Sequence, residues 1–105
     1  MFTKCFIGED TDMGNDSFRD IIITFSENEM VPRVMVFWND SVKACVNGSE
    51  LIQALTKLEK AGVKILVAGH ALNNLKLKSS LRVGNLANHF DLVAAINKVQ
   101  KVVTF

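Results

Sequence analysis

The sequence predicts a single α/β domain over residues 1–105, built as a three-layer α/β/α sandwich around a mostly parallel, five-stranded sheet. Val63–Ala68 is a continuous, mostly apolar run without alternation, which is typical of a parallel strand covered by helices on both faces. Apolar runs of this kind alternate along the chain with helical patterns, and this order indicates βαβ units. The length of 105 residues fits one domain.

The first part of the chain predicts two strands separated by a helix. Residues 2–7 form the first strand, and a polar loop over 8–14 follows it. Asp16 or Ser17 can cap the helix, because both side chains accept hydrogen bonds from free backbone N–H groups. The helix itself is indicated by apolar residues spaced i, i+3, i+4 and i+7, namely Phe18, Ile21, Ile22 and Phe25. Residues 34–38 are the second continuous apolar strand.

The middle of the chain predicts a second helix and the third strand. A connector over 39–48 has room for one helical turn, and Ser49 caps the helix that follows. Its apolar stripe consists of Leu51, Ile52, Leu55 and Leu58. Gly62 ends the helix as a C′ glycine, and the third strand begins at Val63.

The last third of the chain predicts a short helix or coil over 72–77, a short strand over 82–84 and a final helix. Asn88 starts this helix, with Asp91 at the capping-box position. Its residues Phe90, Val93, Ala94 and Ile96 are expected to face the sheet. Residues 101–105 are expected to close the sheet as its fifth strand.

Composition excludes several classes of function. The net charge of +1 favours no particular partner, and the loose cluster of Lys76, Lys78 and Arg82 lacks interleaved aromatic residues, so no nucleic-acid partner is predicted. No apolar run approaches the roughly 18 residues of a membrane span, so no membrane association is predicted. The first residues fit a strand better than a signal peptide, and we expect a cytoplasmic protein.

The sequence predicts neither a metal nor a cofactor. The loop carrying Asp10, Asp12 and Asp16 lacks the glycine and the terminal glutamate of a calcium loop, and it matches no phosphate-binding glycine motif. Cys5 and Cys45 form neither a CxxC motif nor a metal-ligand cluster. We expect Cys5 to be an inert core residue inside the first strand.

The ends of the predicted strands indicate where a ligand would bind, because open parallel sheets bind ligands at their carboxyl edge. Gly69 and His70 follow the third strand, and His70 could act as a general acid or base. Cys45 lies near Lys43, whose ammonium group would lower the pKa of a neighbouring thiol. The predicted pocket comprises Asp12, Met13, Asn39, Gly69, His70 and Asn73.

Two stretches suggest a family. Residues 34–72, VMVFWNDSVKACVNGSELIQALTKLEKAGVKILVAGHAL, together with LRVGNLANHFDLVAAINKV further on, resemble the DsrE-like (DsrE/DsrF/YchN) superfamily. The resemblance is greatest to the DsrE-like C-terminal domain of YedF-like proteins, which are linked by name to selenium and sulfur metabolism. It implies an α/β/α fold, a homo-oligomer (a trimer or hexamer) and, in some members, a role in sulfur relay with a protein partner.

The same resemblance exposes a missing residue. Relay members of the family carry a persulfide on a cysteine just after the third strand, where YedF-like domains often read C-G-T-C-L. This chain has Ala68-Gly69-His70-Ala71-Leu72, with alanine at both cysteine positions. Because a persulfide needs a thiolate that attacks a sulfur donor, the relay role does not carry over at this site.

Three hypotheses follow. The first is an oligomeric DsrE-like protein without the relay cysteine, acting as a non-catalytic binding or assembly module in sulfur or selenium handling. The second is a sulfurtransferase whose persulfide carrier is Cys45. The third is a small-molecule enzyme that uses His70 as acid or base.

An oligomer is also indicated by composition, because the apolar fraction of 49% and the mean hydropathy of +0.20 are high for a small monomer. Ile23 lies off the main apolar stripe of its helix, and Met30, Val31 and Phe105 add further apolar surface. We expect these residues to contact a neighbouring copy.

Overall fold

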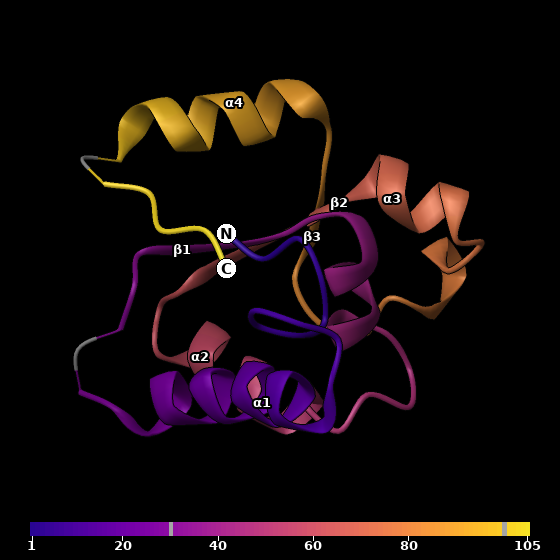
Figure 1. Cartoon of the computed structure of the whole chain (residues 1–105). Helices are drawn as coiled ribbons and strands as arrows, with labels where there is room; N and C mark the ends of the chain where they lie inside the picture. Colours follow the sequence, from indigo (N-terminus) through magenta and orange to yellow (C-terminus); the bar gives the residue numbers. More distant parts are fainter. Residues whose placement is uncertain (30, 100) are drawn as a thin grey trace.

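The computed structural model describes residues 1–29, 31–99 and 101–105, and these form an α/β structure with a parallel sheet (Figure 1). In chain order the elements are α1 (Asp12–Glu27), β1 (Val34–Phe37), the 3-10 helix η1 (Asn39–Cys45), α2 (Ile52–Lys60), β2 (Lys64–Ala68), α3 (Gly69–Asn74), the 3-10 helix η2 (Lys78–Ser80), β3 (Asn85–Ala87) and α4 (His89–Lys98). The predicted α/β class is confirmed. The described residues form three regular strands rather than the five expected.

The sheet has the order β1-β2-β3, and both pairs of neighbours are parallel. Helices α1 and α2 lie on one side of it and α4 on the other (Figure 1). β2 is the central strand, and its residues Ile65 to Ala68 are all buried. This burial on both faces explains why the sequence of β2 shows no alternation of apolar and polar residues.

The expected strand over residues 2–7 is reduced to a single bridge. Phe2 donates its N–H to the carbonyl of Val36 (2.7 Å) and accepts the N–H of Trp38 (2.8 Å). The chain then bends away, and Ile7 donates to the carbonyl of Gly14 (3.0 Å) rather than to the sheet. The buried hydroxyl of Ser41 also donates to the Phe2 carbonyl (2.6 Å), which fixes the N-terminal segment at the end of β1.

The expected closing strand over 101–105 is likewise not regular. Its backbone lies beside the N-terminus: Phe105 donates to the carbonyl of Met1 (2.8 Å), and the Met1 ammonium donates to the carbonyl of Val103 (2.6 Å). The Phe105 ring stacks on Phe2 with ring centroids 5.0 Å apart. Both chain ends therefore meet at the outer edge of β1, held by isolated contacts instead of a ladder (Figure 1).

The predicted helix starts were right at one helix and wrong at another. α4 begins after Asn88, whose side chain accepts from the Asp91 N–H (2.9 Å) while the Asp91 carboxylate accepts from the Asn88 N–H (3.0 Å). α1 begins at Asp12, before the predicted cap at Asp16 or Ser17. Thr11 is the actual cap, because its hydroxyl accepts from the Gly14 N–H (3.1 Å).

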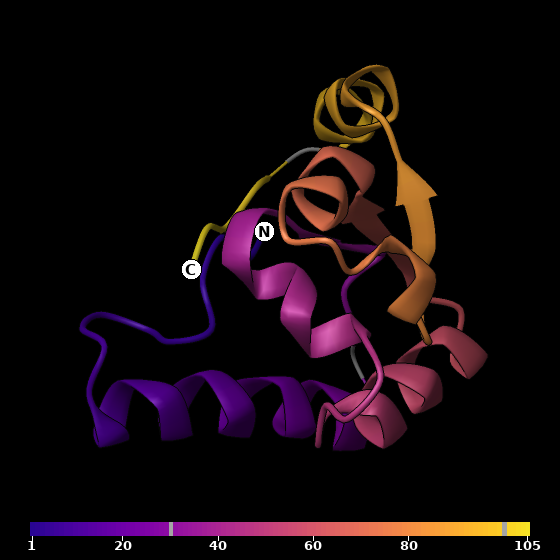
Figure 2. The ribbon, with the colours of Figure 1, turned by 90° about the vertical axis from the view of Figure 1, so that its right-hand side faces the viewer.

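The last strand is displaced from its predicted position over 82–84. Residue Arg82 donates instead to the carbonyl of Cys45 (2.9 Å), and the chain turns at Gly84, where φ is +86°. A Cβ atom at Gly84 would lie 2.8 Å from a methyl group of Val67, so only glycine fits this corner. β3 therefore begins after the glycine and runs directly into α4 (Figure 2).

The orientation of α4 also differs from the prediction. Phe90 and Val93 were expected to face the sheet, but both are exposed, and Leu92 is the buried residue of this helix. Ala94 is exposed as well, whereas Ile96 is partly buried. The apolar residues occupy both sides of α4, so their pattern alone could not decide which side packs inward.

Three of the four apolar residues that we expect to contact a neighbouring copy lie within the described part of the chain. Ile23, Val31 and Phe105 are partly buried and pack against the core of the chain itself. Met30 lies outside the described residues.

Candidate functional site

A pocket of about 480 Å³ lies at the carboxyl ends of β2 and β3. Its walls include the start of α3, which directly follows β2, and the start of α4, which directly follows β3. The pocket is lined by Ala68, Gly69, His70, Asn73, Lys78, Leu86, Ala87, Asn88, His89 and Asp91. This is the edge at which parallel α/β sheets bind their ligands.

Two histidines from different elements meet at this pocket. The ring centroids of His70 on α3 and His89 on α4 are 5.6 Å apart. The His89 ring also stacks on Trp38, with centroids 5.8 Å apart, and the amide nitrogen of Asn74 lies 3.1 Å from Nε2 of His70. The packing of Trp38 and the amide of Asn74 therefore orient two imidazoles toward one space.

The lining of the pocket is rich in hydrogen-bond donors. Lys78 supplies an ammonium group, Asn73 and Asn88 carry side-chain amides, and the imidazoles can donate as well. Asp91 is the one acid in the lining, and its carboxylate already accepts the backbone N–H of Asn88 in the helix cap. The pocket is thus chemically suited to a small anion.

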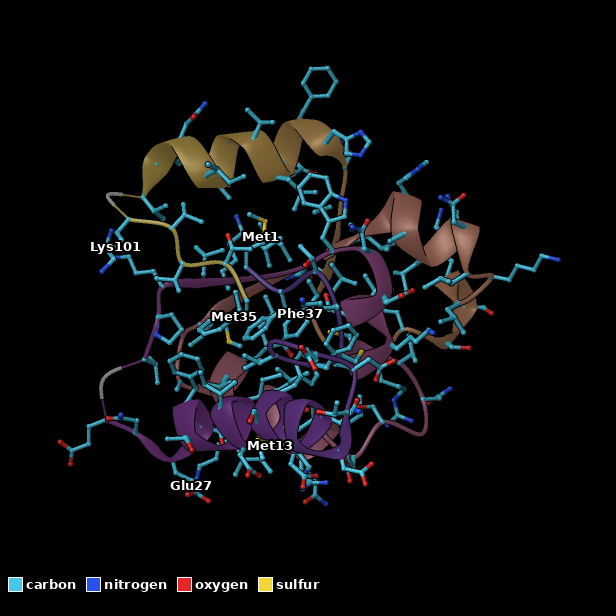
Figure 3. The ribbon with its side chains drawn as sticks, in the orientation of Figure 1. Met1, Met13, Glu27, Met35, Phe37 and Lys101 are labelled. Atoms are coloured by element: carbon cyan, nitrogen blue, oxygen red, sulfur yellow. The ribbon has the colours of Figure 1, made fainter. Side chains whose placement is uncertain are left out.

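The structure brings only part of the predicted pocket together. Gly69, His70 and Asn73 line it, whereas Asp12, Met13 and Asn39 do not. Asp12 and Met13 form the first residues of α1, and Figure 3 shows Met13 across the sheet from α4. Asn39 starts η1 with a left-handed backbone, at φ 54°.

Sequence reasoning missed the residues that α4 and η2 contribute, namely His89, Asn88 and Lys78. The sequence could have indicated these residues only through a correct placement of the last strand. Had the strand been placed at 85–87, after the turn at Gly84, its carboxyl end would have indicated Asn88 and His89 as pocket residues.

Cys45 is fully buried, with 0% of its surface exposed, at the end of η1. Burial raises the pKa of its thiol above the ordinary value, and the nearby charges of Glu59 and Cys5 raise it further. The predicted activation of Cys45 by Lys43 therefore does not occur. A thiol that is kept protonated and covered is a poor nucleophile.

Cys5 lies in a bend rather than inside a strand, and it is half-buried. Its sulfur lies 3.3 Å from the carbonyl oxygen of Asp40, to which the thiol donates. Burial raises the pKa of this thiol, and this effect outweighs the opposing effect of Lys43. Neither Cys5 nor Cys45 lines the pocket that contains His70 and His89, here called the histidine pocket.

A second pocket of about 810 Å³ runs along the outer edge of β1, and it contains none of the predicted site residues. Its walls are mostly apolar and come from β1, α4 and the two chain ends. Over the described ranges, no group of three His, Cys, Asp or Glu side chains is placed to hold a metal ion. Within the same ranges, no helix has the length and apolar character needed to cross a bilayer.

No protein-family model matches this chain, and no curated protein matches it either. The chemistry of the pocket residues is therefore the basis for proposing a function.

Proposed function

We propose that the chain is a DsrE-like binding module without the relay cysteine, and that the histidine pocket binds a small oxyanion in sulfur or selenium handling. One observation carries this proposal: the carboxyl edge of β2 and β3 presents the pair His70 and His89, with Lys78 nearby, and no thiol. Imidazole, ammonium and amide groups recognise anions, but they cannot carry a persulfide. Binding, rather than sulfur transfer, is what these side chains support.

Assembly belongs to the same proposal. As a DsrE-like protein, the chain acts as a homo-oligomer, a trimer or hexamer, with a sulfur-relay partner in the cytoplasm. The proposal also includes a complete five-stranded, three-layer α/β/α sandwich. Support comes from the chain ends, because the Phe2–Val36 and Phe105–Met1 hydrogen bonds lie where two further strands would extend the sheet.

An acid–base enzyme is the second candidate function. It requires a pocket of a few hundred Å³ that contains His70, and such a pocket is present. It ranks second because the amide of Asn74 lies 3.1 Å from Nε2 of His70 and occupies one of its two ring nitrogens. The Cys45 carrier gains no support from a thiol with no exposed surface.

Titration with thiosulfate tests the binding proposal. Trp38 is the single tryptophan of the chain and stacks on His89, so its fluorescence reports on the pocket. We expect a saturable fluorescence change at constant ionic strength, with a Kd of about 1 mM or tighter. Lys78→Ala is expected to weaken binding about tenfold, because it removes a charged hydrogen-bond donor.

Lys57→Ala is the matched control, because Lys57 is an exposed lysine on α2 that does not line the pocket. It should leave the Kd unchanged. The proposal fails if thiosulfate gives no saturable signal up to about 50 mM, or if Lys57→Ala weakens binding as much as Lys78→Ala. Ion chromatography of the thiosulfate after incubation separates the two candidates, because an enzyme acting on thiosulfate would lower its concentration and a binding module leaves it intact.

A further inference from the structure

The apolar pocket along the outer edge of β1, here called the edge pocket, is separate from the histidine pocket. Its volume of about 810 Å³ lies in the range of about 300–1,000 Å³ that is usual for small-molecule sites. The edge pocket and the histidine pocket share no lining residue. Binding of a ligand in the edge pocket is therefore independent of the proposed function.

The edge pocket exists because the inner side of α4 is only partly covered. Leu92, near the start of this helix, is fully buried, with 0% of its surface exposed. Ala95, Ile96 and Val99 lie at i+3, i+4 and i+7 from Leu92, so they share its side of the helix. All three are only partly buried, and all three line the pocket. The far half of α4 thus presents apolar side chains that the body of the protein does not fully cover.

The wall opposite α4 is also apolar. Val34 and Val36 of β1 contribute to it. Phe2 and Phe105 continue it, and their rings stack with centroids 5.0 Å apart. Water beside such walls gains no hydrogen bonds from them, so its replacement by an alkyl chain is favourable. The interior of the edge pocket is therefore suited to an alkyl chain.

Three cationic side chains line the edge pocket at one end. Arg33 directly precedes β1, Lys98 is the last residue of α4, and Lys101 follows in the C-terminal segment. β1 begins and α4 ends on the same side of the molecule (Figure 1), and Figure 3 shows Lys101 on that side. Among the described residues, no acidic side chain lines this pocket, and none pairs with the three cations. Their charge is therefore available to a ligand.

The balance of charge at this end favours an anion. The C-terminal end of α4 carries about half a negative charge from the helix dipole, which opposes an anion. Arg33, Lys98 and Lys101 each carry a full positive charge and together outweigh the dipole. All three are exposed, so water and salt screen them, and each contributes modestly. An apolar interior with a cationic end fits a ligand that has an alkyl tail and an anionic head.

We propose that the edge pocket binds a long-chain alkyl carboxylate, with its alkyl chain between α4 and β1 and its carboxylate among Arg33, Lys98 and Lys101. Burial of methylene groups supplies most of the affinity, and charged hydrogen bonds hold the head at the cationic end. A peptide strand added to β1 fits this edge less well, because Phe2 already donates its N–H to the carbonyl of Val36 there.

Isothermal titration calorimetry of the full chain with dodecanoate, kept below the concentration at which it forms micelles, tests the proposal. We expect a single site per chain with a Kd of about 10 µM. Decanoate is expected to bind about tenfold more weakly, because its alkyl chain is shorter by two methylene groups. The proposal is overturned if dodecanoate gives no saturable heat up to about 1 mM, or if the affinity does not depend on chain length.

Ala95→Phe tests where the alkyl chain lies, because it places a ring in the edge pocket. Dodecanoate binding is expected to weaken at least about tenfold. Ala94→Phe is the matched control, since Ala94 is exposed on the next position of α4 and does not line the pocket. Circular dichroism checks folding. If Ala95→Phe does not fold, Val102→Glu replaces it, because Val102 lines the pocket from a position that is 43% exposed. Equal weakening by the control contradicts the proposal.

The double variant Arg33→Ala/Lys98→Ala tests where the carboxylate lies. We expect the Kd for dodecanoate to weaken about tenfold, because most of the positive charge at the head is lost. Lys57→Ala/Lys60→Ala is the matched control, because both lysines are exposed in the last turn of α2 and line neither pocket. It removes the same charge and should leave the Kd unchanged. An unchanged Kd in the folded Arg33→Ala/Lys98→Ala variant overturns the placement of the carboxylate.

Competition with thiosulfate separates this proposal from the proposed function. Because the two pockets share no residue, thiosulfate and the Lys78→Ala substitution should both leave the Kd for dodecanoate unchanged. If thiosulfate competes with dodecanoate at constant ionic strength, the carboxylate lies in the histidine pocket and the edge-pocket proposal fails. If dodecanoate binds and thiosulfate does not, the edge pocket stands and the proposed function fails.

Discussion

Replacing Phe37 with alanine is expected to lower the free energy of unfolding by about 3–5 kcal/mol, the usual cost of deleting a buried aromatic side chain. Phe37 is 0% exposed, lies beside Val67 of β2, and stacks on Phe2 with ring centroids 5.1 Å apart. Phe2 forms the bridge that holds the N-terminal segment on β1. Truncation at Phe37 therefore leaves a cavity and also loosens that segment. Figure 3 shows Phe37 in the interior between α1 and α4.

Urea unfolding followed by circular dichroism measures this loss. A domain of this size is stable by only about 5–15 kcal/mol, so this loss should move the midpoint of the unfolding transition to a clearly lower urea concentration. Met13→Ala is the control, since this exposed side chain should change the free energy of unfolding by less than about 0.5 kcal/mol. A loss below about 1 kcal/mol for Phe37→Ala would contradict the placement of Phe37 in the core.

The thiol of Cys45 is expected to react with iodoacetamide at least about 100-fold more slowly than the thiol of Cys5 in the folded protein. Cys45 has no exposed surface, and burial raises the pKa of its thiol. It can react only when the chain opens, which for a stable domain is a rare event. Cys5 is half-buried and close to the surface, so the reagent reaches it without unfolding.

Mass spectrometry of alkylated peptides gives the two rates in one sample. Urea should abolish the difference, because both thiols are then accessible and have ordinary pKa values. Cys5→Ser is the matched variant, and its remaining thiol should react at the slow rate alone. Comparable rates in the folded protein would mean that Cys45 is accessible, and the hypothesis of a Cys45 carrier would then regain support.

The parallel sheet and its central strand could be predicted because burial on both faces leaves a clear pattern in the sequence. The run from Val63 to Ala68 is mostly apolar, and the structure forms β2 at Lys64–Ala68. The Asn88 cap with Asp91 was equally predictable, because it depends on two side chains three residues apart. These are local signals that need no knowledge of distant contacts.

The outer strands could not be predicted, because whether and where they form depends on contacts between residues distant in sequence. Residues 2–7 have strand-like composition, but the chain leaves the sheet after Phe2, where Ser41 fixes the Phe2 carbonyl. The displacement of β3 has a similar origin, because Gly84 packs against Val67 and Ile65 and forces the turn. The spacing of apolar residues along the chain gives no information about such contacts.

The site was predictable only on the side that belongs to β2. Gly69, His70 and Asn73 follow that strand in sequence and line the pocket. His89 completes the histidine pair from α4, and it could be placed only when the true end of β3 was known. Because the last strand was predicted three residues too early, the part of the site that follows β3 was not predicted.

Transfer of sulfur from a cysteine desulfurase, followed by mass spectrometry of the intact protein, tests the central claim most directly. The claim is that this scaffold binds a ligand at the place where relay members of the proposed DsrE-like family carry a reactive thiol. We expect no persulfide on Cys45, because this thiol is covered, and none in the pocket, because the proposed family's thiol position is Ala71, on α3. A persulfide that forms on Cys45, and that disappears in Cys45→Ser, would contradict the claim.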